Sequence, residues 1–176
     1  MQAKPGEGQE STQSWTVDVQ HKVKAPREKV WAFYTDHVSW PKWTEMADKV
    51  TLDPPGDLTP NGAGVVPPCC KEFSYVPYHA YKPQGCVRVI EKGPLVVREK
   101  VLTFDEPHKM TYTVVHGMPI SDHWGEVVLV EEDGATLVTW KCTYNAPEGQ
   151  GWLNRAIGEA FKGMLESLAA ELEKTE

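Results

Sequence analysis

Residues 149–173 read GQGWLNRAIGEAFKGMLESLAAELE, and this stretch decides the fold. Apolar residues recur in it at intervals of three and four positions, and charged residues fall mostly between them. This spacing predicts an amphipathic helix of about seven turns, because an α-helix has 3.6 residues per turn. So long an apolar face needs a large partner surface, and we expect that partner to be a curved sheet. The stripe consists of Trp152, Leu153, Ala156, Ile157, Ala160, Phe161, Met164, Leu165, Leu168, Ala169 and Leu172.

The chain before this helix supplies the strands of the sheet. Alternating apolar and polar residues predict a first strand at 15–24. Two short helices are expected, the first at 28–35 and the second through 43–47, with Asp36 as a cap of the second and Pro41 interrupting or starting it. The predicted fold class is α+β: a curved antiparallel sheet of about seven strands wraps around the long C-terminal helix, with two short helices after the first strand. Later segments rich in strand-forming residues predict further strands at 49–52, 86–91, 95–104, 110–117, 122–131 and 137–144.

Two stretches fall outside this pattern. Residues 1–13 are rich in Gly, Glu, Gln and Ser, which predicts a disordered lead, and residues 14–176 are expected to form a single domain. Within that domain, residues 54–84 carry repeated prolines and end in a run of aromatic residues. We interpret them as an irregular, lid-like insertion, because structureless loops of this length are uncommon unless they are functional or disordered.

Composition restricts the range of functions. The formal net charge of −7 argues against nucleic acid or an anionic membrane as the main partner. The chain has no apolar run near the ~18 residues that span a bilayer and no secretory signal at its start. We therefore expect no stable membrane insertion, a cytoplasmic location and reduced cysteines. Cys69, Cys70 and His79 match no zinc-binding spacing, so no metal is expected. The sequence also has no glycine-rich phosphate loop, and no cofactor is expected.

The last predicted hairpin indicates which side chains share a face. A turn at 133–134 places His123 opposite Tyr144 on the inner face, because strand side chains alternate. The outer face then carries Glu126 opposite Lys141, which predicts an exposed ion pair.

The two earlier hairpins extend this inner face. A turn at 92–93 puts Arg88 opposite Val97, so that Arg88 and Glu99 become diagonal neighbours able to form a charge-assisted pair. The next hairpin puts Val97 opposite His116. The concave side of the sheet is therefore expected to carry Arg88, Glu99, Tyr112, His116, His123 and Trp140.

Short pieces of sequence in a fixed order carry a resemblance to a known family. They are VKAP at 23–26, VW at 30–31, Asp36, WPKW at 40–43, GCVR at 85–88, REKV at 98–101, FDEP at 104–107 and GATLVTW at 134–140. Over roughly residues 15–173 the chain resembles the START-like helix-grip superfamily (SRPBCC), in its polyketide cyclase/dehydrase branch. The resemblance implies a deep apolar cavity between sheet and long helix that binds a lipid, sterol, polyketide or hormone, with catalysis in only some members. The insertion at 54–84 is longer than the family leads us to expect.

Function stays open between two main hypotheses. The first is binding or transfer of a small hydrophobic molecule, and the second is a polyketide cyclase or dehydratase in which His116 or His123 acts as general acid/base and Arg88 polarises a carbonyl. A protein with a collapsed cavity and a protein partner is a third possibility. Arg88 and Glu99 either anchor a ligand or only neutralise each other. The expected ligand-binding residues are Arg88, Glu99, Tyr112, His116, His123, Trp140, Phe161 and Met164.

Overall fold

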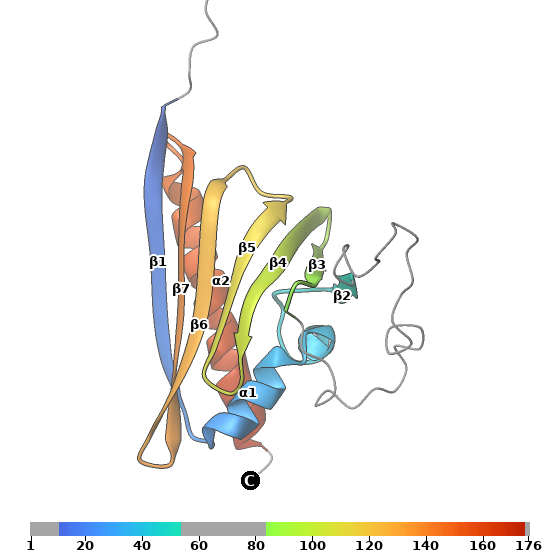
Figure 1. Ribbon diagram of the computed structural model, residues 1–176, viewed down its shortest axis with the longest axis vertical. Coiled ribbons are helices and arrows are strands. Elements are labelled where there is room, and N and C mark those ends of the chain that lie inside the picture. The colour runs from blue at the N-terminus through green and yellow to red at the C-terminus, as the bar shows by residue number, and fades with distance from the viewer. Residues whose placement is uncertain (1–10, 54–83, 175–176) are drawn as a thin grey trace, which may run out of the picture.

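The computed structural model describes residues 11–53 and 84–174. All strands in this part of the chain form one antiparallel sheet of seven strands, in the order β1-β7-β6-β5-β4-β3-β2. Figure 1 shows the sheet curving over α2, with α1 at one end. The elements are β1 (Thr12–Val23), α1 (Arg27–Thr35), the short 3-10 helix η1 (His37–Lys42), β2 (Lys49–Asp53), β3 (Val87–Lys92), β4 (Leu95–Asp105), β5 (Lys109–His116), β6 (Ser121–Glu132), β7 (Ala135–Pro147) and α2 (Gly151–Glu173).

The predicted fold class is confirmed. Strands β3 to β7 follow one another as neighbours in the sheet, and β1 completes it by pairing with β7. The turn between β6 and β7 consists of Asp133 and Gly134, with φ angles of 53° and 74°. Positive φ at both positions is what a tight two-residue hairpin requires, because its twist then matches that of the strands.

The long helix α2 divides its apolar stripe between two environments. It packs along β1, where the backbone at Gly151 and Gly158 approaches Trp15 and Val17 closely. Its C-terminal half buries apolar residues in the core: Leu165, Leu168, Ala169 and Leu172. Its N-terminal half instead leaves Trp152, Ala156 and Ala160 exposed. The sheet alone therefore does not bury this half of the apolar stripe.

Several predicted boundaries are corrected. Strand β1 begins at Thr12, so the expected lead at 1–13 overlaps the sheet by two residues, and residues 1–10 lie outside the described part. The second short helix is η1, at His37–Lys42, and not at 43–47; Asp36 precedes it without a side-chain capping bond. Apart from Gln84, the predicted insertion at 54–84 lies outside the described residues, as do Cys69, Cys70 and His79.

The predicted register of β6 and β7 is confirmed from Glu132 opposite Ala135 to Gly125 opposite Cys142. It breaks beyond that point, because an irregularity between Ser121 and Trp124 removes the predicted pairing of His123 with Tyr144.

The register of β3 and β4 differs from the prediction in a useful way. The turn is one position later than expected, so Arg88 pairs directly with Glu99 and not with Val97. The shift is by two residues along one strand, and an even shift keeps every side chain on its predicted face. Arg88 and Glu99 therefore remain on the same side of the sheet.

A bulge overturns the prediction for His116. The register between β4 and β5 shifts between Arg98 and Glu99, so that His116 pairs with Arg98 and not with Val97. Val97 and Glu99 both line the cavity described below, so Arg98 between them points the other way. His116 follows Arg98 and is exposed.

The predicted exposed ion pair of Glu126 is also corrected. Glu126 pairs with Lys141 in the strand register, but its carboxylate contacts Lys109 Nζ at 2.6 Å. Lys109 lies on the neighbouring strand β5.

Candidate ligand site

A cavity of about 680 Å³ lies between α2 and the inner face of the sheet. Its walls come from residues 152–167 of α2, the inner faces of β3 to β6, the segment 44–46 after η1 and the loop 117–120 between β5 and β6. Leu95 and Trp152 at its rim remain 48% and 56% exposed, so the cavity is open to solvent. Most of the lining is apolar: Met46, Ile90, Leu95, Val97, Val114, Met118, Pro119, Ile120, Trp152, Leu153, Ala156, Ile157, Ala160, Phe161 and Met164.

The structure separates the predicted site residues into three groups. Five of them line the cavity: Glu99, Tyr112, His123, Phe161 and Met164. Arg88 and Trp140 are fully buried just behind this wall and do not line it, and His116 lies outside.

Arg88 and Glu99 form the predicted ion pair. Arg88 Nη2 donates to Glu99 Oε2 at 2.7 Å, and the Arg88 side chain is completely buried. Glu99 is 9% exposed and reaches the cavity. The pair therefore presents a carboxyl group to the cavity and keeps the guanidinium beneath it.

The burial of Arg88 depends on further partners. Its Nη1 donates to His37 Nε2 at 3.0 Å. The guanidinium carbon also lies 4.7 Å from the ring centre of Tyr112 and 5.2 Å from that of Trp40, distances at which aromatic faces attract a cation. A buried cation needs such additional contacts, because one carboxylate rarely offsets the cost of removing it from water.

Sequence reasoning missed His37. A buried arginine has five N–H donors, and one carboxylate cannot accept hydrogen bonds from all of them. A further acceptor is therefore expected, but nothing in the sequence indicates which residue supplies it. His37 stands in η1, which sequence reasoning placed too late in the chain. The guanidinium has no acceptor atom, so His37 Nε2 must be the unprotonated nitrogen of a neutral ring.

The pKa values of this cluster follow from its burial. Burial raises the pKa of Glu99 above its ordinary value of 4.5, and the opposing effect of Arg88 is smaller. Burial and the neighbouring Arg88 cation both hold the pKa of His37 well below 6.5. Both effects keep His37 neutral, as the hydrogen bond from Arg88 requires.

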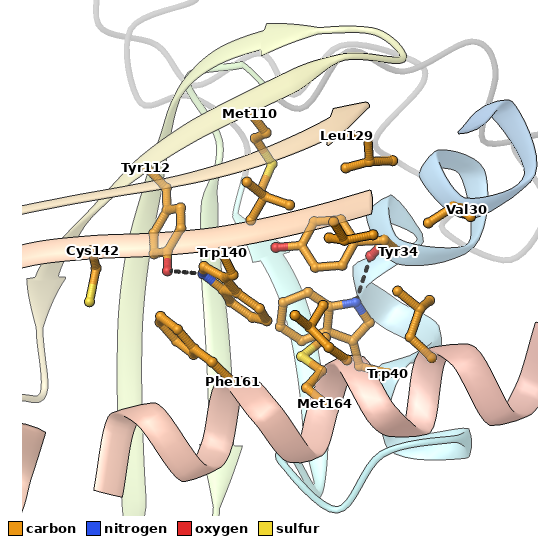
Figure 2. Packing of buried hydrophobic residues seen from close by; sticks show 14 of the residues in the cluster. Val30, Tyr34, Trp40, Met110, Tyr112, Leu129, Trp140, Cys142, Phe161 and Met164 are labelled. Atoms are coloured by element: carbon orange, nitrogen blue, oxygen red, sulfur yellow. Dashed lines mark hydrogen bonds between the residues drawn. The ribbon is translucent and has the colours of Figure 1, made fainter. Parts of the chain in front are cut away.

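An aromatic stack forms the inner wall beside this pair. Phe161 stacks on Trp140 with ring centres 4.1 Å apart and planes at 11°. Trp140 Nε1 donates to the Tyr112 hydroxyl at 2.7 Å, as Figure 2 shows. Tyr112 lies flat over Gly125, where an added Cβ would come within 2.5 Å of its ring. A glycine is therefore needed at this position, and the stack links α2 to the middle of the sheet.

His123 lies beside Tyr112 on the cavity wall, with ring centres 5.4 Å apart. Its Nδ1 accepts a hydrogen bond from the Val114 main-chain N–H at 3.1 Å. Burial, together with the Arg88 cation, lowers the pKa of His123 from 6.5 to about 4. At neutral pH the ring is therefore uncharged, with its hydrogen on Nε2.

Charged groups otherwise stand at the rim. Glu45, Lys92 and Glu159 are exposed members of the lining. Among residues 11–53 and 84–174, no cluster of histidine, cysteine, aspartate or glutamate is placed to hold a metal ion. No helix in the same part of the chain is long and apolar enough to cross a membrane.

Sequence reasoning also missed the loop 117–120, which contributes Met118 and Ile120 to the cavity. The signal was available, because two large apolar residues in a hairpin loop seldom face solvent without a reason.

Comparison with known proteins places the chain in a family. The family model described as polyketide cyclase / dehydrase and lipid transport matches residues 14–174. A comparison with curated proteins gave no match.

Several solved structures share the fold. The protein XoxI from Bacillus cereus is 15% identical with a TM-score of 0.64, covering 89% of this chain and 94% of that one. A norcoclaurine synthase point mutant from Thalictrum flavum, solved with a transition state analogue, is 12% identical with a TM-score of 0.64, covering 96% and 100%. The di-domain ARO/CYC protein BexL is 14% identical with a TM-score of 0.65, covering 89% of this chain and 49% of that one. At these identities the likeness shows the fold alone.

Proposed function

Because the chain belongs to the polyketide cyclase/dehydrase and lipid transport family, we propose that it binds a small, mostly apolar molecule in the cavity under α2. One observation carries the proposal: a lining that is apolar over most of its extent and polar at one inner patch. That patch consists of Glu99, Tyr112 and His123. Small-molecule sites typically combine an apolar wall with a few placed polar groups.

The size of the cavity suits a lipid, sterol, polyketide or similar skeleton. Its volume of about 680 Å³ lies in the range of roughly 300–1,000 Å³ that small-molecule pockets occupy. The open rim at Leu95 and Trp152 gives such a molecule a route inward. Burial of its apolar surface supplies the main driving force, at roughly 25 cal/mol per Å².

Binding of the neutral fluorescent probe N-phenyl-1-naphthylamine tests this proposal. Ala160 lines the cavity on α2, and Ala170 is exposed on the same helix but is not part of the lining. Ala160→Phe fills cavity space, so we expect the probe affinity to fall about tenfold or more. Ala170→Phe adds the same side chain outside the cavity and should leave the affinity unchanged. Equal affinity in wild type and both variants would place the probe elsewhere and refute the proposal.

The enzyme hypothesis finds less support in the geometry. His116 lies outside the cavity. His123 has a pKa of about 4 and its Nδ1 is already occupied, which makes it a weak base at neutral pH. Arg88 is enclosed behind Glu99 and is not part of the lining, so it does not meet a carbonyl in the cavity directly. Binding is therefore the function that this arrangement supports best.

A further inference from the structure

His123 occupies a break in the sheet that fixes its side chain. The pairing of β6 with β7 is irregular between Ser121 and Trp124, and irregularities of this kind re-aim side chains. The neighbouring strand β5 then holds the residue at two points. Thr113 Oγ1 donates to the His123 carbonyl at 2.6 Å, and the Val114 N–H donates to Nδ1 at 3.1 Å. Backbone and ring are thus both anchored.

The bond from Val114 determines the tautomer. A main-chain N–H can only donate, so Nδ1 must be the acceptor nitrogen and Nε2 must carry the hydrogen. Among residues 11–53 and 84–174, Nε2 has no hydrogen-bond partner, and it is not one of the fully enclosed polar atoms. His123 is half-buried and lines the cavity. Its free N–H is therefore available to a molecule in the cavity.

The surrounding charges restrict what that molecule offers to the N–H. The Glu99 carboxylate lines the same cavity and disfavours an anionic group beside it. A cationic group such as an ammonium or guanidinium has no acceptor atom, so it cannot take the hydrogen bond from the N–H. An uncharged acceptor is the remaining choice, and the carbonyl oxygen of a ketone, ester or amide is such a group.

From this geometry we infer that His123 is the specificity-determining hydrogen-bond donor of the cavity, and that it selects apolar molecules carrying an uncharged carbonyl oxygen. The inference rests on the proposed binding function. It adds the chemical class of the ligand and the residue that recognises that class. Tyr112 supports the donor by packing its ring against His123.

Two matched naphthalenes test the inference. 2-Acetylnaphthalene carries a carbonyl, and 2-ethylnaphthalene is nearly the same size without one. Each displaces bound N-phenyl-1-naphthylamine, which gives the ratio of the two affinities for every variant. His123→Phe keeps a ring and removes the N–H, so the preference for the acetyl compound should fall about three- to tenfold. His116→Phe makes the same change at an exposed histidine and should leave the ratio as in wild type.

The outcomes separate the two proposals. If both naphthalenes displace the probe and His123→Phe leaves the ratio unchanged, the inference is overturned while the binding function stands. If neither displaces it, the inference is overturned, and the binding function is then decided separately by the probe affinities of the Ala160→Phe and Ala170→Phe variants.

A second measurement needs no variant. Side-chain ¹⁵N spectra of the wild-type histidines should show His123 with its hydrogen on Nε2, and saturation with 2-acetylnaphthalene but not 2-ethylnaphthalene should shift that nitrogen. A hydrogen on Nδ1, or equal shifts with both compounds, would overturn the inference even where His123→Phe fails to fold.

Discussion

Replacing Glu99 with leucine leaves the Arg88 guanidinium buried without the carboxylate that it contacts at 2.7 Å. Arginine cannot release its proton in a protein, so the charge persists, and loss of one partner of a buried pair typically costs ~3–5 kcal/mol. Replacing Arg88 with methionine should cost less, because the abandoned Glu99 can take up a proton. The double variant removes both charges from an apolar wall, so its free energy of unfolding should lie within about 2 kcal/mol of the wild-type value.

The two single costs should therefore greatly exceed the cost of the double variant, with a coupling energy of about 3 kcal/mol or more. Urea denaturation of the four proteins at pH 7 measures it. Lys49 and Glu91 provide the control, because they form an ion pair of similar length, 2.9 Å, with side chains 61% and 38% exposed. The cycle Lys49→Met with Glu91→Leu should give a coupling of only ~0.2–1 kcal/mol. A coupling at positions 88 and 99 no larger than this control would refute the reasoning.

The free energy of unfolding of the same variants should also depend on pH. Burial already raises the pKa of Glu99 in the folded protein, and loss of Arg88 raises it further. A group whose pKa is raised on folding stabilises at low pH, and that stability is lost as the pH rises through the folded-state pKa. The cost of Arg88→Met should therefore grow between pH 4.5 and 7.

Three further predictions concern the cavity wall. Gly125→Ala should destabilise by ~1–3 kcal/mol in urea denaturation, because the new Cβ meets the Tyr112 ring at 2.5 Å; an unchanged midpoint would contradict the tight contact. Phe161→Ala should cost about 3 kcal/mol by losing its stack on Trp140, and a loss below about 1 kcal/mol would mean that the helix is docked differently. Because the pKa of His123 is lowered to about 4, its contribution to the free energy of unfolding is present above pH 6.5 and falls by roughly 3 kcal/mol as the pH drops towards 4. The difference in urea midpoint between wild type and His123→Gln should therefore shrink over that pH range. A constant difference would contradict the lowered pKa.

Local sequence patterns were sufficient for the fold. The periodicity of residues 149–173 identified α2, and turn residues such as Asp133 and Gly134 separated strands whose side chains alternate. The same alternation placed Arg88 and Glu99 on one face, although their turn is one position later than expected. An even error in register leaves the faces intact, which is why this part of the site was predictable.

The rest of the site depended on irregularities that alternation does not encode. One bulge in β4–β5 moved His116 to the exposed face. His37 joins the site through η1, a short helix with Pro41 inside it and no apolar repeat to mark it. Trp140 was correctly placed inward but supports the wall from behind, because depth within a core cannot be read from the face of a strand.

The division of α2 has a consequence for how such a protein changes over time. Its C-terminal turns pack in the core through Leu165, Leu168 and Leu172, while Ala156 and Ala160 are exposed and line the cavity. Selection for a new ligand can therefore act on one end of a helix while selection for folding acts on the other. Under the proposed binding function, a library randomised at 156 and 160 should yield mostly folded members with altered ligand preference, which makes this helix a starting point for engineering a sensor.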